Sequence, residues 1–148
     1  AIPRAVRANA EAFLAAPIAK LGPRGIAKAG KLLADWLRRG DEARGELARI
    51  AALMERGGTG GAFFRNLYRD FLAASLPICD EPLLAAGHER YAAIAPLWTE
   101  AAGLLERAAA SGEQGALDQA GALFGELARR EREAMELLAG VRDRQPAA

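Results

Sequence analysis

Two long stretches of mainly small and aliphatic residues fill the carboxy-terminal half of this chain: residues 82–112, PLLAAGHERYAAIAPLWTEAAGLLERAAASG, and residues 113–141, EQGALDQAGALFGELARREREAMELLAGV. In each stretch, mainly apolar positions recur in alternating steps of three and four, the period of one buried face of an α-helix. We therefore predict two long helices that pack as an antiparallel hairpin over residues 80–142, with a turn at Ser111-Gly112. The predicted contact positions are Leu84, His88, Tyr91, Ile94, Trp98, Ala101, Leu105 and Ala108 in the first helix, and Leu117, Ala120, Phe124, Leu127, Glu131, Ala134, Leu138 and Val141 in the second.

The turn position also predicts how the two helices of the hairpin align. Folding the chain there sets Trp98 near Leu127 and Ile94 near Glu131. Pro96 lies inside the first helix and is expected to kink it, because proline removes one backbone donor and clashes with the preceding turn.

Composition extends the helical interpretation to the rest of the chain. The 148 residues include 36 alanines and 20 leucines but only ten β-branched residues, a balance that favours helices over sheets. The sequence predicts an all-α fold of about six helices in a single domain, a small bundle with the long hairpin at its carboxy-terminal end. Four shorter helices are expected within residues 1–76, at about 3–16, 23–39, 42–56 and 62–76, and residues 143–148 are expected to form a frayed tail.

Charge is unevenly distributed along the chain. Residues 1–69 hold 13 basic and 6 acidic residues, whereas residues 70–148 hold 7 basic and 13 acidic ones, for a net charge of only +1. The first half could therefore dock an acidic partner through a basic face at Lys28, Lys31 and Arg38, or the two halves could neutralise each other across their interface. The net charge alone points to neither nucleic acid nor a membrane.

The first residues lack a signal-peptide core, and no run of about 20 apolar residues is present, so a soluble cytoplasmic location is expected.

The chain contains few groups suited to catalysis. Cys79 is the single cysteine and His88 the single histidine, so no intrachain disulfide can form and no metal-ligand spacing is present. A Cys79–His88 dyad could transfer acyl groups, but a packed thiol and a structural imidazole are the more common roles for such residues. No metal and no cofactor is expected. Glu131 would need a partner if it is buried, and Tyr91 or His88 lies within reach of it in the predicted hairpin.

A run of glycines interrupts the helical pattern at residues 57–61, GGTGG. A glycine-rich segment before a helix can cradle an anion, although this one lacks the Lys-Ser/Thr of a phosphate-binding loop and no strand precedes it. Glycines this dense indicate close backbone approach. Either two helices cross there, or a ligand or another domain lies against Gly58, Thr59, Gly60 and Gly61.

The helix expected after the glycines carries two arginines four residues apart. Arg65 and Arg69 would project from one face, where they could hold a carboxylate or phosphate. Structural pairing with Asp70 or with acidic residues of the hairpin is the alternative. Tyr68 is expected in the core with its hydroxyl at an edge.

The string ERGGTGGAFFRNLYRDFLAAS, residues 55–75, resembles the carboxy-terminal helical region of the BtrH-like proteins, named for the butirosin biosynthesis protein H. The matching motifs are Gly58 to Gly61, Phe64-Arg65, Leu67-Tyr68 and Phe71-Leu72, and the segment Glu131 to Ala134 resembles the acidic second arm of the family's terminal hairpin. The resemblance extends over about residues 1–142, and only the central twenty are specific.

This resemblance implies acyl transfer from a carrier protein to an amine in natural-product biosynthesis. It also implies a cysteine-peptidase-like catalytic domain, which nothing in this sequence matches, so no catalytic residue can be assigned from the family. The residues Gly58, Thr59, Gly60, Gly61, Arg65, Tyr68 and Arg69 then become the expected contact for that domain or its substrate.

The chain would thus be an accessory domain that works with a catalytic partner and an acyl carrier protein. One alternative is a non-catalytic helical interaction module that dimerises through the hairpin. Another is a small enzyme that uses Cys79 and His88.

Overall fold

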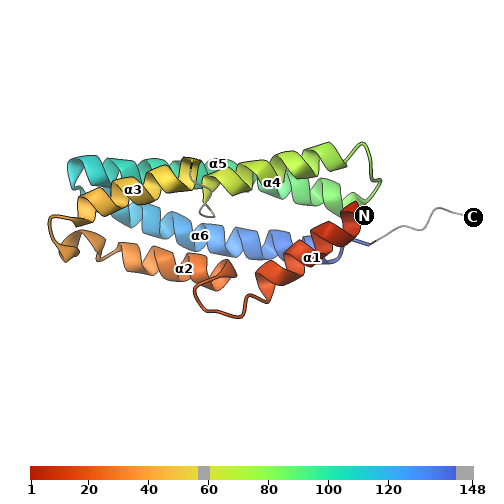
Figure 1. The fold of residues 1–148 in the computed structure, drawn as a ribbon, viewed down its shortest axis with the longest axis horizontal. Coiled ribbons are helices and arrows are strands. Elements are labelled where there is room, and N and C mark those ends of the chain that lie inside the picture. The colour runs from red at the N-terminus through yellow and green to blue at the C-terminus, as the bar shows by residue number, and fades with distance from the viewer. Residues whose placement is uncertain (57–60, 143–148) are drawn as a thin grey trace, which may run out of the picture.

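The computed structural model of this chain describes residues 1–56 and 61–142, and these residues form helices and no strand. The all-α prediction is confirmed, as is the long hairpin at the carboxy-terminal end (Figure 1). Residues 143–148, the expected frayed tail, lie outside the described residues. The α-helices of the described part are α1 (Ile2–Leu14), α2 (Gly22–Leu33), α3 (Ala43–Arg56), α4 (Ala62–Ser75), α5 (Pro82–Ser111) and α6 (Gln114–Ala139).

The hairpin of α5 and α6 forms the centre of the molecule (Figure 1). The two shorter helices α1 and α2 follow one another along α6, and α3 and α4 follow one another along α5. The molecule is therefore arranged as a four-helix bundle. α5 and α6 are two of its long members, and the pairs α1 with α2 and α3 with α4 take the places of the other two. The two helices of each pair meet near the middle of the hairpin's length.

Trp98 lies where the hairpin prediction placed it along α6. The Trp98 indole nitrogen donates a hydrogen bond to Glu131 at 2.6 Å, and the Trp98 ring packs edge-on against Phe124 with ring centroids 5.4 Å apart. These two α6 residues lie on either side of Leu127, the position predicted to face Trp98. At the turn, Gly112 adopts the left-handed conformation, with φ 72°, that glycine accommodates most readily. α5 continues through Pro96 as one helix of 30 residues.

The second helix ends earlier than predicted. The second helix was expected to reach Arg39, but α2 ends at Leu33 and a separate 3₁₀ turn, η1, covers Trp36–Arg39. The carbonyl of Ala34 accepts a hydrogen bond from the Gln114 side chain of α6 instead of continuing the helical ladder, and the chain turns there toward α3. This break places the Trp36 ring at the end of α2, with the Arg39 guanidinium 4.5 Å from the ring centroid.

Glycine allows α2 and α6 to pack with their backbones close together. A Cβ atom on Gly30 would lie 2.8 Å from the Gly121 carbonyl oxygen, and one on Gly121 would lie 2.9 Å from the Gly30 oxygen. Neither position has room for a side chain, so this pair fixes the distance between the two helices.

Some basic residues of the first half stabilise helix ends of the hairpin. Arg44 of α3 donates hydrogen bonds to the carbonyls of Ala109, at 2.7 Å, and Ala110, at the carboxy-terminal end of α5. Arg7 of α1 donates to the carbonyl of Val141, just beyond α6, at 3.1 Å. Because the carboxy-terminal end of a helix carries partial negative charge, these contacts are favourable, and they account for part of the charge asymmetry of the sequence.

Candidate functional site

A buried ion pair between α4 and α6 lies at the centre of the candidate site. Arg65 binds Glu131 through two hydrogen bonds, Nε to Oε1 at 2.7 Å and Nη2 to Oε2 at 2.9 Å. The Glu131 side chain is 0% exposed and that of Arg65 is 14% exposed. Glu131 Oε1 also accepts the Trp98 indole bond, and the Arg65 guanidinium stacks 4.5 Å from the centroid of that ring. The carboxylate is thus held by groups from two other helices.

The prediction that Tyr91 or His88 would satisfy Glu131 is wrong. Both residues lie on α5, whereas the main partner comes from α4, and sequence spacing along the hairpin could not show which α4 side chain would reach α6. Burial disfavours the charged form of Arg65, but the hydrogen bonds and negative charge of Glu131 outweigh this effect, so the pKa of Arg65 is raised. The Arg65 guanidinium therefore stays protonated opposite the Glu131 carboxyl group.

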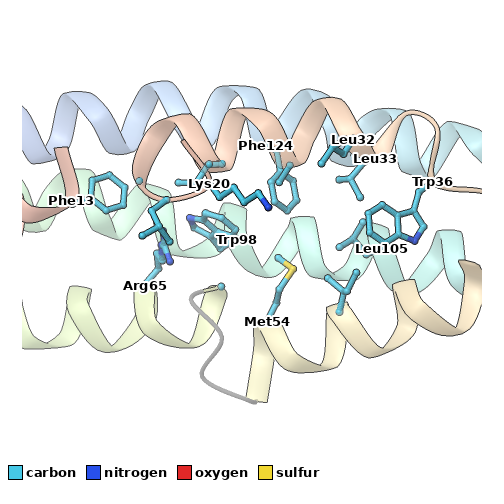
Figure 2. Close-up of a pocket in the computed structure, with 17 residues that line it drawn as sticks. Phe13, Lys20, Leu32, Leu33, Trp36, Met54, Arg65, Trp98, Leu105 and Phe124 are labelled. Carbon is cyan, nitrogen blue, oxygen red and sulfur yellow. The ribbon is translucent and has the colours of Figure 1, made fainter. Parts of the chain in front are cut away.

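An apolar groove of about 530 Å³ lies on one side of the ion pair (Figure 2). Its two walls are α2, which contributes Ile26 and Leu33, and α3, which contributes Ile50 and Met54. Leu105 and Trp98 of α5 and Phe124 of α6 line it between the walls. Phe13 and Arg65 lie at one end and Trp36 at the other (Figure 2).

The α2 side of this groove has an apolar edge. Leu21 and Leu32 both line the groove, and each is more than half exposed. Exposed leucines beside an apolar space are a common feature of ligand grooves. The volume lies within the range of about 300–1,000 Å³ that is typical of small-molecule sites.

A smaller space of about 270 Å³, here called the tyrosine chamber, lies on the other side of the ion pair. It shares Phe13 and Arg65 with the groove. The rings of Tyr68 and Tyr91 meet edge to face in its wall, with centroids 4.8 Å apart. The full lining is Asn9, Phe13, Phe64, Arg65, Tyr68, Tyr91, Glu131 and Met135.

The hydroxyls of both chamber tyrosines are buried and have no hydrogen-bond partner in the part of the chain that the structure describes. Asn9 lies near the Tyr68 hydroxyl, but the two groups do not have the geometry of a hydrogen bond. Burial raises the pKa of Tyr68, and burial together with the negative charge of Glu131 raises the pKa of Tyr91 further. Both hydroxyls are therefore neutral near pH 7. The expectation that the Tyr68 hydroxyl would lie at an edge is wrong.

The two arginines of α4 do not form a joint anion site. Arg65 pairs with Glu131 of the hairpin, and Arg69 pairs with its neighbour Asp70 at 2.8 Å. Each guanidinium thus has its own carboxylate. Asp70 and an acidic residue of the hairpin are the partners that the alternative of structural pairing predicted.

The glycine run can be assessed only at its last residue. Gly58, Thr59 and Gly60, predicted to contact a substrate or partner, lie outside the described residues. Gly61 is the N-cap residue of α4 and lines the groove, and a Cβ atom there would lie 2.7 Å from Met54 Cα. At Gly61, close approach of two helices accounts for the glycine.

Cys79 and His88 gain no support as a catalytic pair. Cys79 is half-buried against the core between α4 and α5, and His88 is half-buried on α5. Neither residue lines the groove or the tyrosine chamber. Within residues 1–56 and 61–142, no group of three or more His, Cys, Asp or Glu side chains is placed to hold a metal ion. In the same residues, no helix combines the length and apolar character needed to cross a membrane.

The predicted basic docking face is accessible. Lys28 and Lys31 are exposed on α2, and Arg38 is exposed on η1. Arg38 forms an ion pair with Asp35 at 3.0 Å, so the lysines are the more available cations for a partner.

The sequence pattern did not predict one prominent surface. Four large apolar side chains of α4, Phe63, Phe64, Leu67 and Phe71, are each between 40% and 49% exposed. We call these four residues the α4 surface. The signal was present in the sequence, because α4 has apolar residues at six of ten positions between 63 and 72, more than one buried face requires.

Comparison with known proteins places the chain in a family. Neither a curated protein nor a solved structure matches it. One family, described as a domain of unknown function (DUF4872), matches residues 1–138, a range that runs from α1 almost to the end of α6. The chain therefore belongs to the DUF4872 family.

Proposed function

We propose that this chain is a helical accessory domain of a BtrH-like acyl-transfer system, which positions substrate for a catalytic domain that is not contained in this sequence. The α4 surface carries the proposal. Exposed aromatic and aliphatic side chains that gather on one helix are typical of protein interaction sites. This surface lies within the twenty residues on which the family resemblance rests, beside the expected contact residues Arg65, Tyr68 and Arg69.

The arrangement of α4 suits a positioning role. Its outer side presents Phe63, Leu67 and Phe71, which follow one another at four-residue spacing. On its inner side, Arg65 lines both the groove and the chamber, and Tyr68 lines the chamber. A partner bound to α4 would therefore lie one helix diameter from the space where a substrate could be held.

An acyl carrier protein is the second proposed partner. Carrier proteins are acidic, and the exposed Lys28 and Lys31 provide a basic face on α2. Lys28→Glu and Lys31→Glu should each weaken carrier-protein binding, with the largest loss at low salt. Unchanged affinity of both variants at low salt would count against this docking face.

A homodimeric interaction module is the competing function, and the same exposed side chains favour it. In the described residues, large exposed apolar side chains occur on α4 and in other segments of residues 1–78 but not on α5 or α6. A dimer would therefore form through the α4 surface rather than through the hairpin.

A binding experiment separates the two functions. The chain is mixed with the cysteine-peptidase-like domain of a BtrH-like protein, and masses are measured in solution. Leu67→Asp should abolish the heterocomplex, whereas Ile18→Asp, at a similarly exposed apolar site in the loop between α1 and α2, should not. A stable homodimer that Leu67→Asp dissociates, without any heterocomplex, would establish the competing function.

A further inference from the structure

The groove and the tyrosine chamber adjoin each other. Phe13 and Arg65 line both spaces, and the ion pair lies between them. The groove is lined mainly by apolar side chains, whereas Tyr68, Tyr91 and Asn9 are among the residues that line the chamber. A molecule that filled both parts would need an apolar chain and a polar head.

The shape of the groove defines the apolar part. Its lining follows α2 from Gly22 to Leu33, a distance of about 17 Å at about 1.5 Å per helical residue. The walls come from α2 and α3, which stand on different helices of the hairpin. A long, narrow space between two helices fits an extended aliphatic chain better than a compact ring system.

The chamber defines the head group. The Tyr91 side chain is 1% exposed, and its hydroxyl has no partner in the described residues, as is also true of Tyr68. A buried hydroxyl without a partner is costly, so a group that could donate to it or accept from it would bind favourably. The charges of Arg65 and Glu131 compensate each other, so the chamber offers no uncompensated charge to an ionic head.

We propose that the groove and the tyrosine chamber together bind one elongated amphiphilic molecule, with an unbranched aliphatic chain between α2 and α3 and a neutral amide or hydroxyl head beside Tyr68 and Tyr91. This site shares only Phe64 with the α4 surface and does not depend on a partner protein. It can therefore be tested on the isolated chain, and its failure would leave the partner contact through the α4 surface untouched.

Calorimetric titration of the isolated chain with simple probes tests the aliphatic part. Octanamide should bind more tightly than butanamide, by about fourfold for each added methylene that enters the groove. Ala29→Phe, which narrows the groove from α2, should abolish octanamide binding. The control Ala34→Phe, at an exposed position beyond the groove, should bind as the natural sequence does.

The same titration tests the head group. Octanamide should bind more tightly than octanoate, and Tyr91→Phe should weaken octanamide binding by about three- to tenfold, the effect of one neutral hydrogen bond. The same substitution should leave octanoate affinity nearly unchanged. A chamber that holds only water would give equal octanamide affinity in Tyr91→Phe and the natural sequence, which would overturn the head-group assignment.

Two further results would overturn the site as a whole. One is equal affinity for butanamide and octanamide. The other is unchanged octanamide binding in Ala29→Phe. If far-UV circular dichroism shows that Ala29→Phe does not fold, Ile50→Phe from the opposite wall replaces it, with the same expected loss.

Discussion

The buried ion pair between α4 and α6 gives the sharpest test of how this bundle is held together. Glu131→Leu removes the carboxylate and leaves two buried donors without their acceptor: the Arg65 guanidinium and the Trp98 indole N–H. Breaking a buried pair in this way costs about 3–5 kcal/mol. Since domains of this size are stable by only about 5–15 kcal/mol, the loss should be a large fraction of the total.

The complementary change separates the ion pair from simple packing. Arg65→Met alone should also be destabilising, because it leaves the Glu131 carboxylate, 0% exposed, without its cation. The double variant Arg65→Met with Glu131→Leu contains neither charge. It should lose only the Trp98 hydrogen bond, about 1–3 kcal/mol, although the two single losses add up to at least about 6 kcal/mol.

Urea unfolding followed by far-UV circular dichroism measures all four proteins. With a denaturant slope of about 1–3 kcal/mol per molar, Glu131→Leu should lower the unfolding midpoint by more than about 1 M. The double variant should recover most of that difference. A double variant as unstable as the sum of the two single ones would refute the buried ion pair as the cause of these losses. A Glu131→Leu variant whose stability lies within about 1 kcal/mol of the natural sequence would do the same.

Three further predictions concern packing and titration. Gly121→Ala should destabilise the fold by about 1–3 kcal/mol, because its Cβ would meet the α2 backbone. Gly125→Ala, one turn away and in open space, should stabilise the fold by about 0.5–1 kcal/mol. Urea midpoints of the two variants that shift in the same direction would contradict this prediction. Tyr91→Phe should be neutral or stabilising near pH 7, since the hydroxyl has no partner in the described residues. Because the pKa of Tyr91 is raised in the fold, the natural sequence should also lose more stability than this variant as pH rises above about 10. A clear loss of stability in Tyr91→Phe at neutral pH would show that the hydroxyl does have a partner. Hydrogen bonds from Arg129 and Arg130 lower the pKa of Glu126 to about 2. The difference in urea midpoint between the natural sequence and Glu126→Gln should therefore shrink as pH falls from 4.5 toward 2. A difference that stays constant over this range would show that the ion pairs are screened by solvent.

The architecture follows largely from the sequence because its main determinants are local. Alanine and leucine content sets the helical class, and the spacing of apolar residues sets the alignment of α5 and α6 around Trp98. The end of α2 could not be predicted in this way. There the Ala34 carbonyl accepts a hydrogen bond from Gln114, a residue 80 positions away along the chain.

The candidate site was predictable only in part. The pairing of Arg65 with an acidic residue of the hairpin was one of two alternatives, but its identity as Glu131 depends on how α4 rotates against α5 and α6. That same rotation turns Leu67 outward and Tyr68 inward, so the exposed α4 surface and the tyrosine chamber arise together. A helix with apolar residues on both sides contains no sequence signal for which side is buried.

The placement of the two tryptophans has a practical consequence. Trp36 and Trp98 are the only ones in the chain, and both line the apolar groove. The Trp98 indole donates to a carboxylate beside a guanidinium, whereas the Trp36 indole N–H has no acceptor in the described residues, so the two rings experience different electric fields. The protein therefore has a built-in optical reporter. A molecule that enters the groove will change the tryptophan emission without any label, while a partner that binds only the α4 surface will leave it unaltered.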